Sequence, residues 1–298
     1  MTPRLRMASN PTAVTYRSII PPRIKTLIVA VDGSGLAEQM TLALMKLPHF
    51  ANTNLLLVHV VRPQITSSVA AAHWQAGQDL LDQSRASFPA NDLIQTRLVE
   101  GDPKNVLFQL AKTELDPMLV MGTSQHNRFA AIFENSISQY IFQMAQCPML
   151  MIRDGLFLKR IQRVMVALNS SVASQESLQM AIQIAQEIPG AEVQLARVQL
   201  DTVSTTRDPV LENAIGQLNR HHIRHRVLRS VGDAGPEIAR LSHEANTDLL
   251  LLGSPDRRPA FAQNIPDFDR LFGPSTSDYL RQHSACPVLM VRSASDSE

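Results

Sequence analysis

Short continuous runs of apolar residues alternate along this chain with longer segments whose apolar residues recur at helical spacing. In the first half such runs occupy residues 24–31 (IKTLIVAV), 55–61 (LLLVHVV) and 118–122 (MLVMG), with a shorter one near 93–99. Runs without a polar face are typical of strands buried on both sides of a parallel sheet. The segments between them, including residues 69–88, predict helices. This alternation predicts right-handed crossovers and an open parallel sheet with helices on both faces.

Turn and capping residues mark the boundaries of these elements. Residues 32–35 (DGSG) predict a turn before the first helix, which we expect to end near Pro48. Asp102 is suited to cap the helix that has Pro103 just inside its start. Ser136 is placed to open the last helix of this half, which leads into a final apolar strand.

A second copy of the pattern occupies the rest of the chain. Long matches in the same order at a nearly constant offset indicate two copies of one domain. Residues 161–171 restate 24–34, residues 231–254 restate 100–123, and residues 274–292 restate 135–153. The sequence therefore predicts a disordered basic leader, a first domain, a linker, a second domain and a tail, at residues 1–23, 24–153, 154–160, 161–292 and 293–298.

Composition predicts a soluble globular protein. Of 298 residues, 44% are hydrophobic and 18% are charged. The net charge of +1 gives no overall attraction to nucleic acid or anionic lipid. No apolar run reaches the roughly 18 residues that a membrane-spanning helix needs. The composition thus favours neither a membrane protein nor a general nucleic-acid binder.

The cysteines and the leader bear on the compartment. Cys147 and Cys286 stand before prolines at matching positions of the two copies, and two cysteines are too few for a disulfide framework. We expect both to be buried and reduced, in a cytoplasmic protein. The leader lacks acidic residues and a continuous apolar core. A disordered tail is the expectation for it, and an organelle transit sequence is the alternative.

Several motifs resemble those of universal stress proteins of the tandem two-domain type. They are VAVDGS at residues 29–34, Gly-Asp before a helix at 101–102 and 232–233, Gly122 at the end of the fourth strand, and the closing CPMLMIR and CPVLMVR. The resemblance covers residues 24–292. It implies two tandem Rossmann-like (adenine nucleotide alpha hydrolase-like) domains, each an open five-stranded parallel sheet with helices on both faces. It also implies pairing through the last strand of each domain, and adenine-nucleotide binding in members that keep a glycine pattern.

That glycine pattern is incomplete in the first half. In the nucleotide-binding branch of the family the fourth strand ends in G-x-x-G, and G-Ser or G-Thr follows after nine intervening residues. The matching positions here are Gly122, Gln125, Asn135 and Ser136. Asn tolerates a left-handed backbone better than most residues, so Asn135 is the milder change. Gln125 puts a side chain where backbone should approach a phosphate.

The strand order that the resemblance implies places Asp32 and Gly122 at one crevice, where strand order reverses. There Asp32 can accept hydrogen bonds from a ribose or an adenine amine, and Ser136 and Ser138 can donate to phosphates. The candidate adenine-nucleotide (ATP) site comprises Asp32, Ser34, Gly122, Asn135, Ser136 and Ser138. The alternatives are that Asp32 merely caps a turn and that Ser136 merely caps a helix.

The second half departs further from the pattern. Gly253 is followed by Asp256, a longer loop, and Pro274, while Asn169 replaces Asp32. Asp256 adds negative charge where a polyphosphate would lie, and Pro274 removes an N–H donor. We therefore expect no nucleotide to bind this half in the family's manner. The loop at residues 254–273, which includes three phenylalanines, is expected to form a lid over its own domain.

Residues 220–229 (RHHIRHRVLR) form a basic cluster with three histidines. As a surface strand they would place His221 and His225 on one face and His222 on the other, so three zinc ligands would not converge. A solvated strand is the expectation, with a metal site or an anionic partner as alternatives.

No catalytic constellation emerges from the motifs. The prediction is a non-catalytic stress-response protein that acts by ligand or partner binding. The alternatives are an ATP-binding switch with slow hydrolysis in the first half and a ligand-free scaffold for an unknown protein partner. The strands at residues 149–152 and 288–291 are expected to be buried by pairing between the halves or between chains, and homodimers stay open.

Overall fold

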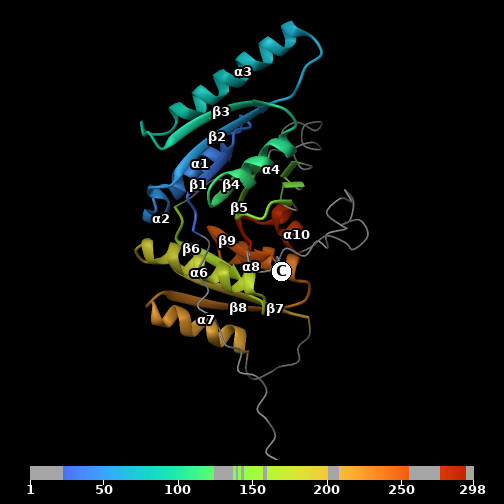
Figure 1. Ribbon diagram of the computed structural model, residues 1–298. Helices are drawn as coiled ribbons and strands as arrows, with labels where there is room; N and C mark the ends of the chain where they lie inside the picture. Colours follow the sequence, from blue (N-terminus) through green and yellow to red (C-terminus); the bar gives the residue numbers. More distant parts are fainter. Residues whose placement is uncertain are drawn as a thin grey trace, which may run out of the picture.

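The chain folds around one ten-stranded sheet in which both halves take part (Figure 1). The structure is a computed structural model that describes residues 23–123, 137–138, 140–141, 144–156, 160–200, 208–254 and 276–292. The strand order is β3-β2-β1-β4-β5-β10-β9-β6-β7-β8. Strands within each half are parallel, as the apolar runs predict. The α/β fold with two Rossmann-like halves is thus confirmed.

The helices and strands follow the predicted boundaries to within a few residues, and the first helix ends at Leu44, before the predicted end near Pro48. In the first half they are β1 (Thr26–Ala30), α1 (Leu36–Leu44), α2 (Pro48–Ala51), β2 (Asn54–Val61), α3 (Ser67–Ala86), β3 (Ile94–Glu100), α4 (Pro103–Thr113), β4 (Pro117–Thr123) and β5 (Met149–Arg153). In the second half they are β6 (Arg163–Ala167), α6 (Val172–Glu187), β7 (Glu192–Gln199), α7 (Pro209–Arg220), β8 (Arg224–Val231), α8 (Ala234–Glu244), β9 (Leu249–Ser254), α10 (Thr276–His283) and β10 (Val288–Arg292).

Capping explains where α4 begins. The Asp102 side chain accepts a hydrogen bond from the amide of Lys104 at 2.8 Å, and Pro103 occupies the first turn. The cap satisfies one of the amides that every helix start leaves unpaired. The short helix α2 was not predicted, because four residues are too few to show a helical period.

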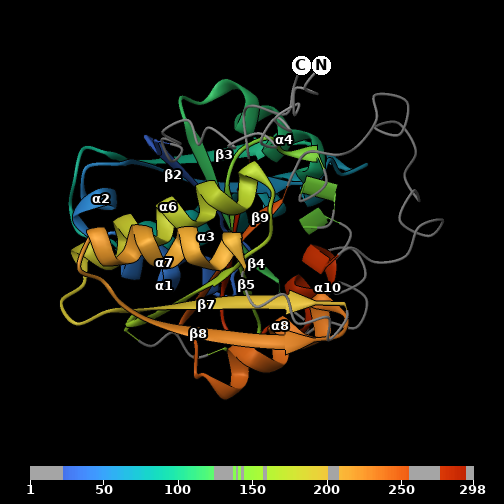
Figure 2. The same cartoon turned by 90° about the horizontal axis from the view of Figure 1, so that it is seen from below.

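Alternate residues of each strand enter two separate cores. The core on one face packs under α1, α3, α6 and α7, and the core on the other packs under α4, α8 and α10. Both run without a break through the two halves, because β5 and β10 contribute fully buried residues to each of them. Figure 2 shows α6 and α7 on one side of the β7–β8 ladder and α8 on the other.

The halves join through their last strands. β5 and β10 pair antiparallel, with Val288 opposite Met151 and Met290 opposite Met149. The prediction that these strands are buried by pairing is confirmed, and the pairing lies within one chain. Beside the strands, the guanidinium of Arg281 on α10 donates a hydrogen bond from Nη1 to Oγ of Ser138 at 3.3 Å. A buried polar contact therefore also connects the halves.

The two cysteines are free and buried, as expected, at the starts of β5 and β10. Burial raises the pKa of the Cys147 thiol to about 11 and that of the Cys286 thiol to about 12. Because the thiolate is the reactive form, both side chains behave as small apolar groups at neutral pH.

The predicted surface strand at residues 220–229 is wrong at its start. His221 ends α7, and His222 has a φ of 56° in the turn that follows, so regular alternation begins only at Arg224. Among the described residues, no group of three His, Cys, Asp or Glu side chains could hold a metal ion. Within the same described set, no helix is long and apolar enough to cross a membrane. The predicted leader, apart from Arg23, and the lid loop after Ser254 lie outside the described residues.

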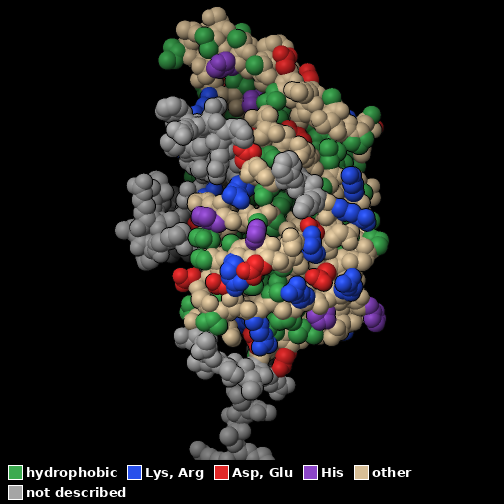
Figure 3. Space-filling view, turned by 180° about the vertical axis from the view of Figure 1, so that it is seen from behind, with side chains coloured by type: hydrophobic (Ala, Val, Ile, Leu, Met, Phe, Trp, Pro, Cys, Tyr) green, Lys and Arg blue, Asp and Glu red, His purple; other side chains and the backbone are tan. Residues whose placement is uncertain are grey.

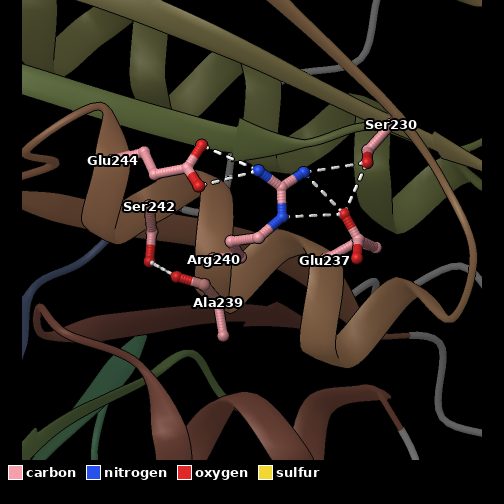
Figure 4. A network of polar contacts seen from close by, with 6 residues as sticks. All are labelled: Ser230, Glu237, Ala239, Arg240, Ser242 and Glu244. Atoms are coloured by element: carbon pink, nitrogen blue, oxygen red, sulfur yellow. Dashed lines mark hydrogen bonds and ion pairs between the residues drawn. The ribbon is translucent and has the colours of Figure 1, made fainter.

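A network of charges fastens α8 to β8 (Figure 4). Arg240 donates from Nη1 to both carboxylate oxygens of Glu244, at 2.8 and 2.7 Å. From Nη2 it donates to Glu237 at 2.7 Å and to the Ser230 hydroxyl at 3.0 Å. The hydrogen bond from Arg240 is the main cause of a lowered pKa at Glu237.

Because the pKa of Glu237 is lower in the folded chain, its ionised form stabilises the fold at neutral pH, and this contribution disappears as the pH falls below the ordinary value of 4.5. We expect Glu237→Gln to melt at a lower temperature than the wild type at pH 7, and this difference to shrink on acidification. Thermal melts across pH 3 to 7 measure it. Glu100→Gln is the control, since Glu100 has no ion pair among the described residues. A difference that is constant with pH would contradict the prediction.

Candidate functional site

A pocket opens at the carboxyl ends of β1, β2 and β4, where β1 lies between the other two strands. Strand order reverses here, the usual ligand position in open parallel sheets. The pocket has a volume of about 310 Å³. It is lined by Ala30, Val31, Asp32, Val58, His59, Val60, Arg62, Pro103, Leu107, Met121, Gly122 and Ile137.

The turn after β1 holds Asp32 in place. Gly33 and Gly35 have φ values of 86° and 74°, which side-chain-bearing residues rarely adopt. This backbone lets the Ser34 amide and hydroxyl both donate to Oδ1 of Asp32, at 2.8 and 2.6 Å. Asp32 therefore does cap the turn, as the alternative interpretation held. Its second oxygen, Oδ2, makes no hydrogen bond in the described part of the chain, and the residue is exposed.

Gly122 lets this turn approach the end of β4. A Cβ atom at Gly122 would lie 3.1 Å from Oδ2 of Asp32 and 3.2 Å from Oγ of Ser34. Any side chain would push against the turn that positions the carboxylate. The structure thus brings together Asp32, Ser34 and Gly122, three of the six residues that the sequence proposed for the site.

Ser138 lies elsewhere. Its side chain is only 1% exposed, it accepts the hydrogen bond from Arg281, and it is not among the residues lining the pocket. Ser138 thus makes a contact at the junction of the halves, and its donation to a phosphate stays a prediction. Asn135 and Ser136, together with Gln125, lie outside the described residues.

Two polar pocket residues were missed from the sequence, His59 and Arg62. Nδ1 of His59 lies 2.8 Å from the carbonyl oxygen of Val31. When Nδ1 donates to this carbonyl, Nε2 is left as an acceptor. The available signal was that His59 is the one polar residue in the apolar run at 55–61, near the end of the strand that adjoins β1.

The second half has a crevice at the equivalent position, with a volume of about 730 Å³. Arg197 projects from β7 as His59 does from β2. It donates from Nε to Asp208 at 2.9 Å and from Nη1 to the carbonyl of Leu168 at 3.4 Å. Burial raises the pKa of the Asp208 carboxyl, but the hydrogen bond and charge of Arg197, together with hydrogen bonds from the amides of Leu211 and Val210, outweigh burial and lower it. This crevice is larger, yet Arg197, the charged side chain among its described lining residues, is already paired with Asp208.

Asn169, which replaces Asp32 in the second half, also has its side-chain oxygen engaged in a hydrogen bond. Oδ1 of Asn169 accepts a hydrogen bond from the Ser171 amide at 2.8 Å, as Asp32 does from Ser34. A neutral amide retains the turn but offers no carboxylate to a ligand. Asp256 and Pro274, on which the expectation for this half also rested, lie outside the described residues.

Packing explains why Gly253 is a glycine. A Cβ atom there would lie 2.1 Å from the carbonyl carbon of Ala173 and 2.2 Å from the amide nitrogen of Ser174. Both belong to the first turn of α6, which rests directly on the end of β9. Backbone atoms cannot move aside as the end of a flexible side chain can. The packing of α6 therefore accounts for this glycine, and the glycine by itself does not indicate a phosphate site.

We expect Gly253→Ala to lower the free energy of unfolding by about 3 kcal/mol or more, because α6 must shift to admit the methyl group. Gly216→Ala is the matched control, since Gly216 lies in α7 with open space at its Cβ position. There alanine should raise stability by roughly 0.5–1 kcal/mol. Chemical denaturation of both variants measures the effect. Equal stabilities of the two variants would contradict this packing role.

Comparisons with known proteins agree with this architecture. The Universal stress protein family matches twice, at residues 23–153 and 160–292. The universal stress protein Rv2623 of Mycobacterium tuberculosis is 25% identical over 162 residues, which are 51% of this chain and 54% of that protein. The match thus spans about half the length of that curated relative.

Two solved structures share the fold. A universal stress protein from Archaeoglobus fulgidus has a TM-score of 0.69 and 17% identity, covering 91% of this chain and 97% of its own. Protein PA1789 of Pseudomonas aeruginosa has a TM-score of 0.61 and 14% identity, covering 90% of this chain and 92% of its own. Because the family match covers both halves, this chain belongs to the universal stress protein family, with two family domains in tandem.

Proposed function

We propose that the chain is a non-catalytic stress-response protein whose first half binds an adenine nucleotide at the pocket beside Asp32. The observation that carries this proposal is the state of the Asp32 carboxylate. One oxygen is fixed by Ser34, and the other lies beside Gly122 without a hydrogen bond. A carboxylate held this way is a ready acceptor for ribose hydroxyls or for an adenine amine.

The rest of the pocket suits the same ligand. Apolar side chains from four elements form most of its lining, which supports a flat ring by contact. His59 offers a further acceptor, and Arg62 brings an exposed positive charge to the rim. The volume of about 310 Å³ accommodates the nucleoside part. Phosphates would extend past Gly122, near the end of β4.

The proposed role is a non-catalytic one for two reasons. The described lining of the pocket has one carboxylate, of which one oxygen already bonds within the turn, and it has no nucleophile next to a base. Slow ATP hydrolysis in a switch is the alternative use of the same pocket. The two uses differ in product: a binding protein leaves ATP intact over hours, whereas a hydrolase accumulates ADP in proportion to protein concentration.

Thermal-shift titration with ATP, ADP and AMP, with and without Mg²⁺, tests the binding. Ligand at about 100 times its dissociation constant stabilises a protein by roughly 2.7 kcal/mol, so a weak site still raises the melting temperature at millimolar ligand. We expect a ligand-induced rise that is lost in Asp32→Ala. Asp32→Asn, which keeps an acceptor for Ser34, separates loss of the turn from loss of the carboxylate and should also lose the rise.

Asn169→Ala is the matched control, because Asn169 holds the equivalent turn of the second half. It should retain the ligand-induced rise even if its own melting temperature falls. No rise in the wild type, or an undiminished rise in both Asp32 variants, would overturn the proposed site.

A further inference from the structure

β8 is the last strand of the sheet at the end formed by the second half. It pairs along its whole length with β7, from Arg224 opposite Glu192 to Val231 opposite Gln199. In the described part of the chain, no strand lies on its other side. Helices α7 and α8 lie over the two faces of the sheet beside it (Figure 2), and no other strand of the described residues covers the edge itself. Such an edge presents a row of backbone N–H and C=O groups that another strand can pair with.

This edge is strongly basic. Arg224, Arg226 and Arg229 are exposed on β8. Arg224 has a weak ion pair with Glu192 at 3.9 Å. Within the described residues, neither Arg226 nor Arg229 has an ion pair or a side-chain hydrogen bond. Figure 3 shows Lys and Arg side chains over the middle and lower parts of that view, interspersed with Asp and Glu.

The arginines flank the edge on both faces of the sheet. Arg224 and Arg226 lie on the same face of the sheet as Ser230, because side chains alternate along a strand. The hydroxyl of Ser230 accepts a hydrogen bond from Arg240 of α8. Arg229 lies on the opposite face with Val227, which packs against the core under α6 and α7. A strand added along β8 would carry its own side chains alternately to these two faces. The added strand would therefore have arginine side chains of β8 beside it on both faces of the sheet.

The first half shows that the fold does not require this charge. Its equivalent edge strand, β3, carries one arginine, Arg97, which is paired with Glu114 at 3.4 Å, and it also carries Glu100. Positive charge on an edge prevents two copies of that edge from pairing, since like charges on facing strands repel. The same charge attracts a strand of opposite sign.

We propose that the open edge of β8 docks an extended acidic peptide segment of a partner protein as an added strand. Main-chain hydrogen bonds to β8 would supply affinity without regard to sequence. Glu or Asp side chains opposite Arg226 and Arg229 would supply selectivity through charged pairs across strands. The proposal is independent of the nucleotide pocket, which lies in the other half.

A peptide fits this surface better than a nucleic acid. β8 has no Phe, Trp or Tyr on which bases could stack, and the whole chain has a net charge of only +1. Its arginines are divided between two faces of a sheet. A single phosphate backbone lying against one face would leave the others unpaired.

Fluorescence anisotropy with labelled peptides tests the proposal on the full chain. The probes are the eight-residue Glu–Thr peptide Glu-Glu-Thr-Thr-Glu-Glu-Thr-Thr, which carries Glu on both faces of an added strand, the same peptide N-methylated at alternate residues, its Lys–Thr counterpart with Lys in place of Glu, and an eight-nucleotide oligothymidylate. We expect the Glu–Thr peptide to bind, the Lys–Thr peptide not to bind, and N-methylation to weaken binding about tenfold or more, since it removes the donors of an added strand.

Removing two cross-strand charge pairs should also weaken binding about tenfold, so Arg226→Gln combined with Arg229→Gln is the test variant. Arg97→Gln on β3 is the matched control and should bind as the wild type does. The proposal is overturned if the Glu–Thr peptide does not bind or if the N-methylated peptide binds equally well. Tighter binding of the oligothymidylate, or an unchanged affinity of the double variant, would overturn it as well.

Discussion

The antiparallel pairing of β5 with β10 is the contact on which the rest of the structure depends. Each half alone would end in an edge strand that is apolar except for the arginine at its end, and exposed apolar edges promote aggregation. Pairing them removes both edges and makes the two cores continuous across the sheet. The strands are parallel within each half and antiparallel at the junction. The carboxyl ends of the strands of one half therefore lie on the opposite side of the sheet from those of the other half. Each crevice must therefore act with the residues of its own half, and β3 and β8 remain as outer strands of the described sheet.

Equivalent positions in the two halves show how one fold comes to hold two different crevices. At the turn after the first strand of each half, Asp32 uses one carboxylate oxygen in the turn and has the other beside the pocket. Asn169 has a single side-chain oxygen, which bonds within its turn, and it carries no charge. On the second strand, His59 contacts a backbone carbonyl, whereas Arg197 is held in an ion pair with Asp208. Volume alone would favour the second crevice, and the state of the polar groups favours the first. Recognition of a nucleoside needs hydrogen-bond acceptors that are not already engaged. The state of the polar groups is therefore a more specific criterion than the volume of the crevice.

Much of the fold could be predicted from the sequence, because uniformly apolar runs, a capped helix at Asp102 and a long internal repeat all depend on local or repeated signals. The meeting of Asp32 with Gly122 also followed, once strand order was supplied by the family resemblance. Ser138 could not be placed, since its partner Arg281 lies in the other half and no sequence pattern links them. His59 was passed over as part of a buried strand. Gly253 was compared only with the glycine pattern of nucleotide-binding members, and its close packing against the first turn of α6 was not foreseen. Long-range contacts of this kind need coordinates.

The central claim is that two halves of the same fold differ in whether they bind an adenine nucleotide. Equilibrium dialysis of the full chain with radiolabelled ATP tests it most directly, because it counts bound nucleotide without relying on a change in stability. The structure predicts one nucleotide per chain at saturation. Two nucleotides per chain would show that the paired charges of the second crevice open to a ligand, and none would show that the first pocket is closed. Either result would contradict the account.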